Sequence, residues 1–189
     1  MKITTGQIVL VFLLTSCAAL LTTGCKSTDE KHTAITTEKL EPYECGTITR
    51  LHTYKGVFLA SQPNPADFEQ AKDGGVKTVI NLRPAREQKD FNEQQFIEGL
   101  DLTYYNVPVG SADELTDAKF DEARALLRDA ERPIMMHCSS ANRVGAMWLA
   151  YRVLDEGATI DEATAEAKTI GLKLPALQDK AIDYINRQR

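Results

Sequence analysis

One stretch of the sequence combines a cysteine, an arginine and small polar residues at short spacing. It reads RPIMMHCSSANRVGAMWLAYR, from Arg132 to Arg152, and four residues separate Cys138 from Arg143. A thiolate is a strong nucleophile, and a guanidinium can bind two oxygens of a phosphate or similar oxyanion at once. The pair therefore predicts covalent chemistry on an oxyanion, provided that the fold brings the two groups to one place.

The residues around Cys138 predict how the pair is positioned. The apolar run from Ile134 to His137 has the length and composition of a buried strand, and a helical pattern begins near Asn142. The loop between them then lies at a helix N-terminus, where free N–H groups and the helix dipole favour an oxyanion and the thiolate form of a cysteine. The alternative is purely structural, with Cys138 as a small buried side chain and Arg143 as a solvated residue at a helix start.

Strand patterns recur along the chain from residue 47 onward. Two short strands are predicted in TITRLHTYKGVFLAS, with a turn at Lys55 and Gly56, and further buried strands in VKTVINL, DLTYYNVPV and PIMMHC. A helix is predicted after the first two strands, with Asn64 as its cap and Pro65 at its first position.

Further helical patterns lie between and after these strands. Two of them cover residues 87–100 and the segment DAKFDEARALLRDA. Three more follow Cys138. The second of these three has a capping box of Thr159 and Glu162, and the third follows Pro175. The alternation predicts an α/β domain with a mainly parallel central sheet flanked by helices on both faces. In such a fold the ligand site lies at the carboxyl ends of the strands.

The first 24 residues predict an export signal. They hold Lys2 as their one charged residue and an apolar run from Ile8 to Leu21. The run leads into LLTTGC, and the polar segment after Cys25 makes the pattern resemble a bacterial lipoprotein signal that is cleaved before Cys25. Cys17 also fits this pattern, but it would leave an apolar segment at the start of the mature chain. A membrane-spanning anchor is the alternative, although the run is shorter than the roughly 20 apolar residues that a span needs.

A lipid on Cys25 would place the protein in the bacterial cell envelope, anchored to a membrane and facing the periplasm or the exterior. Residues 25–44 have little apolar periodicity and predict a flexible tether, whereas residues 45–189 form one domain that is long enough to bury a core. The formal net charge is −5, and the sequence has no basic stripe, so nucleic acid is not an expected partner.

Two cysteines, Cys45 and Cys138, remain in the domain, and in an exported protein such a pair can form a disulfide. The sequence leaves that pairing open. His32 and His52 have no partners at metal-ligand spacing, so we expect no metal and no other cofactor.

Four motifs occur in an order that resembles a known family. They are FLASQP at residues 58–63, GVKTVINLR at residues 75–83, YYNVPV at residues 104–109, and HCSSANRVGAMWLAYR at residues 137–152. The chain from about Thr47 to Leu172 resembles the bacterial protein-tyrosine-phosphatase-like domains of the dual-specificity type. It is most similar to the phosphatase-like domain of beta-lactamase hydrolase-like proteins.

This resemblance implies a hydrolase that acts on a phosphorylated protein or a small phosphoester through a phosphocysteine intermediate, without a metal. It assigns Cys138 as the nucleophile and Arg143 as the phosphate-binding side chain, with His137 tuning the thiolate. Arg83 would line the same mouth, unless it forms a surface ion pair with Glu87. The loop amides that bind phosphate would come from Ser139, Ser140, Ala141 and Asn142.

The loop departs from the usual phosphatase loop at three points. It is one residue shorter, Ala141 stands in place of the loop glycine, and Val144 replaces the hydroxyl residue that helps the thiolate to leave. A loop of this length also resembles that of rhodanese-type sulfurtransferases, whose cysteine carries sulfur. The alternative functions are therefore a sulfurtransferase and a non-catalytic, anion-binding envelope lipoprotein, although NRVGA and the upstream NLR resemble the phosphatase-like group.

A general acid is predicted on the segment GSADELTD. In related enzymes an aspartate that follows the strand corresponding to YYNVPV protonates the leaving oxygen, and Asp113 is the nearest match, with Glu114 and Asp117 behind it. The alternative is a polar loop in which Thr116 caps the next helix.

Overall fold

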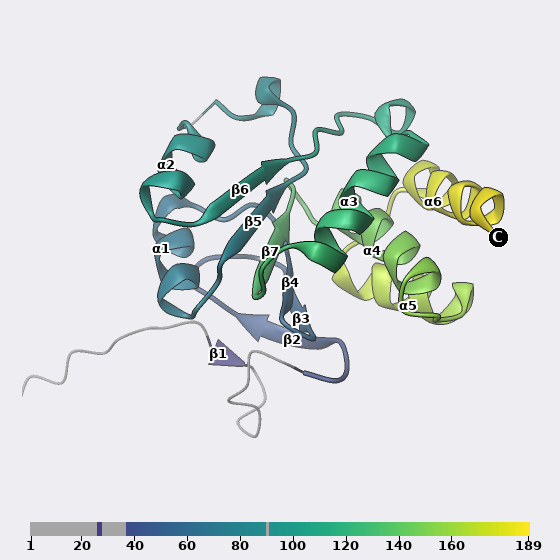
Figure 1. Ribbon diagram of the computed structural model, residues 1–189, viewed down its shortest axis with the longest axis horizontal. Coiled ribbons are helices and arrows are strands. Elements are labelled where there is room, and N and C mark those ends of the chain that lie inside the picture. The colour runs from purple at the N-terminus through teal and green to yellow at the C-terminus, as the bar shows by residue number, and fades with distance from the viewer. Residues whose placement is uncertain (1–25, 28–36, 90) are drawn as a thin grey trace, which may run out of the picture.

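The computed structural model describes residues 26–27, 37–89 and 91–189. The strands form a single mixed sheet in the order β1-β2-β3-β4-β7-β5-β6, which runs through the middle of the molecule (Figure 1). Their bounds are β1 Lys26–Ser27, β2 Glu41–Glu44, β3 Leu51–Tyr54, β4 Val57–Ala60, β5 Thr78–Asn81, β6 Thr103–Asn106 and β7 Ile134–His137.

The half of the sheet that leads to the Cys138 loop is parallel. Strand β7 lies between β4 and β5 and is parallel to both, and β6 is parallel to β5, whereas β1, β2 and β3 pair antiparallel at the other edge. The predicted α/β class is confirmed. The sheet also extends into the predicted tether, because β2 pairs with β3 through Pro42 and His52; residues 28–36 lie outside the described residues.

Helices cover both faces of the sheet, as predicted. Figure 1 shows α1 and α2 on one side and α3, α4, α5 and α6 on the other. The helix bounds are α1 Pro65–Asp73, α2 Glu93–Gly99, α3 Asp117–Asp129, α4 Asn142–Leu154, α5 Ile160–Ile170 and α6 Pro175–Gln188. Side chains of β7 alternate between the two layers: Met135 packs with the α1 and α2 core, while Ile134 and Met136 pack with the larger core on the opposite face.

Local signals set several element boundaries. Asn64 caps α1 and forms a capping box with Asp67, and Thr159 caps α5 through the predicted box with Glu162. The turn between β3 and β4 has positive φ angles at Lys55 and Gly56, as the two-residue turn of a hairpin requires.

The predicted helix over residues 87–100 is wrong in its first half. The structure has a 3₁₀ turn at Ala85–Glu87, and α2 begins only at Glu93. The physical reason is a capping signal inside the segment: the Asn92 side chain accepts a hydrogen bond from the Gln95 N–H, which starts the helix there. The 3₁₀ turn before it is thereby left outside the helix, and its residue Glu87 contacts Arg143.

Helix α4 is the most enclosed of the described helices. Every residue from Val144 to Tyr151 is buried. Gly145 permits close packing against the α5 side, because a Cβ atom there would lie 2.8 Å from the Leu172 Cβ. The N-terminus of α4 therefore has a fixed position relative to the sheet.

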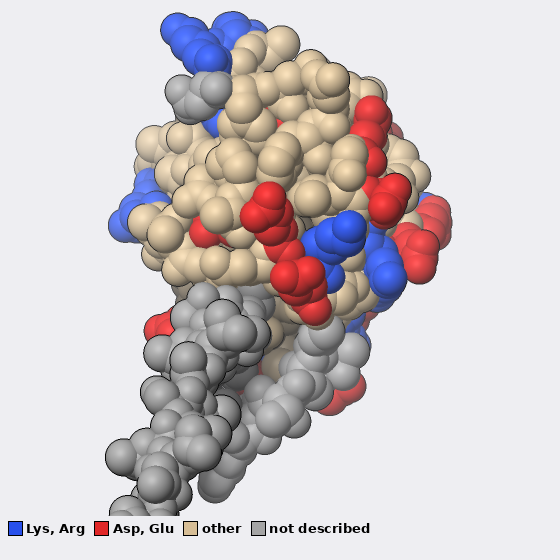
Figure 2. Space-filling view, turned by 90° about the vertical axis from the view of Figure 1, so that its left-hand side faces the viewer, with Lys and Arg blue, Asp and Glu red and all other residues tan. Residues whose placement is uncertain are grey.

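On the outer surface that carries α1 and α2, acidic and basic side chains are interspersed (Figure 2).

Candidate active site

Cys138 lies at the carboxyl end of β7, directly before the loop that leads into α4, as predicted. The strand register places His137 beside Ala60 of β4 on one side and Asn81 of β5 on the other. Backbone hydrogen bonds continue this alignment into the loop, from the Gln62 N–H to the Ser139 carbonyl oxygen at 3.3 Å. The Cys138 thiol is free and fully buried.

The loop backbone presents its amides as an anion site requires. Within the described chain the N–H groups of Ser139, Ser140 and Ala141 donate no hydrogen bond to the protein, and the first N–H groups of a helix lack intrahelical partners. Ala141 caps α4 with a φ of 64°, a left-handed conformation that costs a non-glycine residue about 1 kcal/mol. The usual glycine is absent here, but its conformation is retained.

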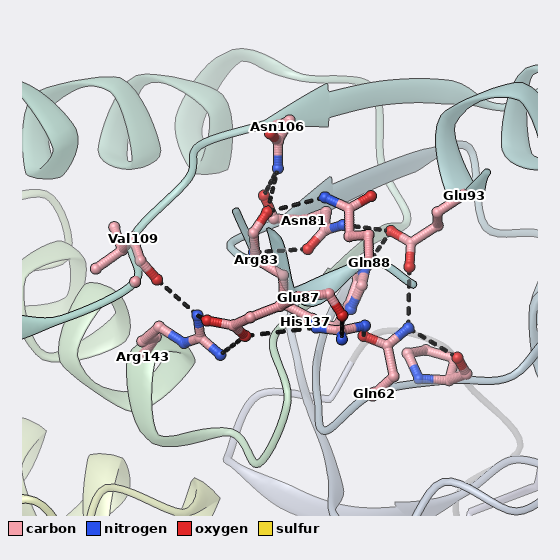
Figure 3. Close-up of polar contacts among 12 residues, drawn as sticks. Gln62, Asn81, Arg83, Glu87, Gln88, Glu93, Asn106, Val109, His137 and Arg143 are labelled. Atoms are coloured by element: carbon pink, nitrogen blue, oxygen red, sulfur yellow. Dashed lines mark hydrogen bonds and ion pairs between the residues drawn. The ribbon is translucent and has the colours of Figure 1, made fainter. Parts of the chain in front are cut away.

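Three hydrogen bonds hold the Arg143 guanidinium. Its Nη1 donates to the Glu87 Oε1 at 3.0 Å and to the Val109 carbonyl oxygen at 2.6 Å, and its Nη2 donates to the Glu87 Oε2 at 2.8 Å (Figure 3). A guanidinium has five N–H donors. The two that remain, on Nε and Nη2, lie side by side and can form a fork for two oxygens of a bound anion. The Cys138 sulfur also interacts with this guanidinium.

The charge of Arg143 is secured by its surroundings. Burial lowers its pKa, but the hydrogen bond to Glu87 and the negative charges of a Cys138 thiolate and of Glu87 outweigh burial and raise it. For Glu87, burial raises the pKa, while hydrogen bonding and charge from Arg143, with a further contribution from Arg83, lower it overall. The Glu87 carboxylate is thus ionised and shared by two arginines.

Glu87 lines the cavity and contacts Arg143, and the sequence analysis did not place it among the site residues. The sequence analysis named an ion pair with Arg83 as the alternative to a place for Arg83 at the cavity mouth, and the structure has that pair at 3.6 Å. Nothing in the sequence indicated the second and closer pair with Arg143, which lies 56 residues further along the chain. Arg83 also donates to the Glu87 carbonyl oxygen and, at 2.7 Å, to the Gln62 Oε1.

His137 points away from the loop into a buried polar network. Its Nε2 lies 3.0 Å from the Glu93 Oε1, and the same carboxylate accepts hydrogen bonds from Asn81 at 2.6 Å and from Gln62 at 2.9 Å (Figure 3). Burial raises the Glu93 pKa, but the charge and hydrogen bond of His137 lower it, with help from Gln62 and Arg83. Glu93 was not among the predicted site residues, and its charge inside a helical pattern gave no signal.

Two cavities open beside these groups. One, of about 360 Å³, is lined by the predicted loop residues Ser139, Ser140, Asn142 and Arg143, together with Glu87, residues 110–112 and residues 174–177. The other, of about 190 Å³, is lined in part by Arg83, Gln88 and Glu93. Arg83 therefore faces a neighbouring cavity and supports Glu87, and it does not line the cavity of Arg143.

Asp113 is not brought together with the other predicted residues. It lies on the 3₁₀ turn Ala112–Glu114, its side chain is 98% exposed, and its carboxylate is 3.8 Å from the Lys180 Nζ. Glu114 accepts hydrogen bonds from the Gly110 N–H and from Arg86, and Asp117 pairs with Arg187. None of these three carboxylates lines the cavity that contains Arg143.

The cysteine pairing that the sequence left open is resolved for the domain. Cys45 is disulfide-bonded and Cys138 is free, so the two do not pair with each other. In the part of the chain that the structure describes, no three His, Cys, Asp or Glu side chains are grouped to hold a metal ion. The same part has no helix with the length and apolar character that a membrane span requires, and Cys25 lies outside the described residues.

Comparison with protein families confirms the predicted resemblance. The family model for the phosphatase-like domain of beta-lactamase hydrolase-like proteins matches residues 51–154. Beta-lactamase hydrolase-like proteins of Xylella fastidiosa and Agrobacterium fabrum are 26% and 27% identical to the chain over 134 residues, or 69% of its length. The match spans 30% of the length of these relatives.

Solved structures share the fold. A Neisseria meningitidis protein described as a possible phosphatase is 26% identical, with a TM-score of 0.57 over 69% of this chain and 94% of that one. TpbA of P. aeruginosa, solved in complex with pTyr, is 22% identical with a TM-score of 0.58, covering 72% and 82%. PTPMT1, solved with PI(5)P, is 17% identical with a TM-score of 0.54, covering 70% and 94%.

Proposed function

The chain belongs to the family of phosphatase-like domains found in beta-lactamase hydrolase-like proteins, and we propose that it is a cysteine-dependent phosphatase. One observation carries the proposal: Glu87 and Val109 hold Arg143 so that two adjacent donors are left for an anion, and the guanidinium interacts with the free Cys138 thiol. A fork of this kind, together with free loop amides, binds the oxygens of a phosphoryl group.

The proposed reaction has two steps. The Cys138 thiolate attacks phosphorus, so that an S–P bond forms while the bond to the ester oxygen breaks, and the alcohol leaves with a proton. Water then attacks the phosphocysteine, the S–P bond breaks, and phosphate and the thiolate are released. Throughout, Arg143 and the amides of Ser139 to Asn142 hold the non-bridging oxygens, where negative charge develops.

The leaving alcohol must receive a proton, and two carboxyl groups near the cavity are candidates to donate it. Glu87 lines the cavity, but as an ionised partner of Arg143 it has no proton to give. Asp113 remains the predicted general acid from the sequence, and it needs a movement of the turn at residues 112–114 to reach the cavity. Esters of acidic alcohols depend least on such an acid.

The substrate is proposed to be a phosphate monoester on a protein or a small molecule. Two proteins of the same fold support this class, because TpbA was solved with pTyr and PTPMT1 with PI(5)P. The shortened loop keeps a sulfurtransferase as the second candidate, since its four residues also fit a persulfide-carrying cysteine. A binding protein without turnover is the third.

One experiment separates these functions. The full-length chain, purified in detergent, is mixed rapidly with an aryl phosphate, and separately with thiosulfate plus cyanide. We expect a burst of alcohol release followed by slow turnover, because Val144 lacks the hydroxyl that helps thiolate departure, and we expect no burst from Cys138→Ser. A persulfide on Cys138 with no phosphocysteine would establish the sulfurtransferase, and oxyanion binding without either product would establish the binding protein.

We also propose that the domain is lipid-anchored in the cell envelope through Cys25. The support is the apolar run that ends in LLTTGC. Labelling with a radioactive fatty acid should give a signal that Cys25→Ser abolishes and Cys17→Ser leaves intact. A thiol that carries a lipid cannot also form a disulfide, so a Cys25–Cys45 bond found by non-reducing peptide mapping would contradict this anchor.

A further inference from the structure

Leu174 is an exposed apolar side chain at the mouth of the cavity that contains Arg143. Its exposed fraction is 54%, the largest of any large apolar side chain in the described residues; Tyr105 on β6 follows at 39%. Leu174 lines the cavity of about 360 Å³ together with Ser139, Ser140 and Arg143, whereas Tyr105 does not. A leucine left in water beside an anion-binding loop is available to contact what the loop binds.

Hydrogen bonds fix Leu174 in place relative to the loop. The Asn142 Oδ1 accepts from the Lys173 N–H at 2.7 Å and from the Leu174 N–H at 3.1 Å, while the Asn142 Nδ2 donates to the Ser140 Oγ at 3.1 Å. The Leu174 carbonyl oxygen accepts from the Leu177 N–H at 3.1 Å in the first turn of α6. The backbone of Leu174 is therefore tied to the Asn142 side chain, which also contacts the loop at Ser140.

The cavity has a charged pair and an apolar wall among its lining residues. Its charged lining residues, Arg143 and Glu87, are paired with each other. Leu174, Pro175, Ala176 and Leu177 form the wall on the α6 side, and Ala112 belongs to the turn that lines the cavity with them. When the loop holds the phosphoryl group, the alcohol part of the ester meets this apolar surface.

Resting on the proposed function, we propose that Leu174 is the specificity-determining residue for the alcohol part of the substrate, selecting esters of apolar, ring-bearing alcohols over esters of small polar ones. Contact of a ring with Leu174 removes apolar surface from water on both sides. A polar alcohol would instead place its hydrogen-bonding groups against the apolar side chains of this wall. An aromatic alcohol is also acidic enough to leave without a donated proton, which suits a cavity whose one lining carboxyl group is engaged by Arg143.

The test compares kcat/KM for phosphotyrosine and phosphoserine, each with blocked termini, in the full-length chain. The difference in leaving group is the same for every variant, so a change in the ratio reports the alcohol pocket alone. Leu174→Asn should lower the preference for phosphotyrosine by about tenfold, and Leu174→Phe should retain it. Vanadate inhibition should be unchanged in both, which shows that the loop is intact. Tyr105→Asn is the matched control, with an expected ratio within about twofold of the wild-type value.

Two outcomes overturn the proposal: a ratio unaffected by Leu174→Asn, or an equal fall in Tyr105→Asn. A binding arm separates this result from failure of the proposed function. If the wild type hydrolyses neither ester but the Cys138→Ser variant binds phosphotyrosine in a Leu174-dependent manner by calorimetry, the selectivity stands and the hydrolase function fails. If both esters are hydrolysed with a ratio insensitive to position 174, the hydrolase function stands and the selectivity fails.

Discussion

The two sides of the cavity around Arg143 differ in how firmly their charged groups are held. On one side, Glu87 and Val109 accept three hydrogen bonds from Arg143, and Arg83 supports Glu87 from behind. On the other side the turn that includes Ala112 lines the cavity, but the next residue, Asp113, projects into solvent, with Lys180 at 3.8 Å as its one ion-pair partner among the described residues.

The difference shows what fixes a charged group at a site. Glu87 is partly buried between two arginines, so leaving its position would strand two cations in a region of low dielectric. Asp113 loses nothing by facing water, because an exposed ion pair contributes little. The side of the cavity that we propose to bind phosphate is thus organised before substrate arrives, and the predicted acid is not held in place.

The largest expected effect comes from removing the organised side. Arg143→Ala deletes the cation and its free fork, and kcat/KM for an aryl phosphate should fall by about a thousandfold, because one positioned donor alone is worth about 10²–10³. Steady-state kinetics and phosphate calorimetry measure the loss. Arg187→Ala is the control. Arg187 is an exposed residue at the far end of α6 and pairs with Asp117 of α3. The kcat/KM of this variant should stay within about twofold of the wild-type value. Retention of a tenth of the activity in Arg143→Ala would refute the clamp.

An intermediate effect is expected from the residue that holds the clamp. Glu87→Gln keeps the shape but removes the charge, and kcat/KM should fall by about tenfold, with a rise in the Kd for phosphate. Arg86→Gln, which alters the exposed pair with Glu114, serves as the matched control.

The effect of Glu87→Gln on the free energy of unfolding should depend on pH. The Glu87 pKa is lower in the folded protein than in the unfolded chain, so its stabilising contribution is present above the unfolded value of about 4.3 and is lost as the pH falls through the folded value. The difference in unfolding free energy between wild type and Glu87→Gln should therefore be present at about pH 7 and shrink below about pH 4. A difference that does not change with pH would argue against an ionised Glu87.

The smallest effect is expected on the exposed side. Asp113→Asn should change kcat/KM for phosphoserine by less than about threefold, whereas loss of a working general acid would cost about 10²–10⁴. Phosphoserine is the sharper substrate for this measurement, because its alcohol leaves poorly without a proton. A hundredfold loss would show that the turn at residues 112–114 closes over bound substrate and would restore the sequence-based assignment of Asp113.

Much of the framework could be predicted from local sequence. The strand before Cys138, the Asn64 cap of α1, the capping box of α5 and the helix start near Asn142 each depend on residues within a few positions of one another. The α2 boundary was missed because Asn92 offered a second helix start inside a continuous helical pattern. Local competition of this kind is decided by tertiary contacts, here the buried bonds that Glu93 makes with His137 and Asn81.

By itself, the sequence determined the α/β class, the position of Cys138 and Arg143 at a strand-to-helix turn, and the family resemblance, because all of these follow from patterns over short stretches of chain. Only the tertiary structure decided which carboxylate meets Arg143. Glu87 and Asp113 both lie in polar turns near cavity residues, and both side chains end in a carboxyl group. Their opposite placement follows from strand order, which sets the loop after β5 beside the start of α4 and leaves the turn before α3 at the surface.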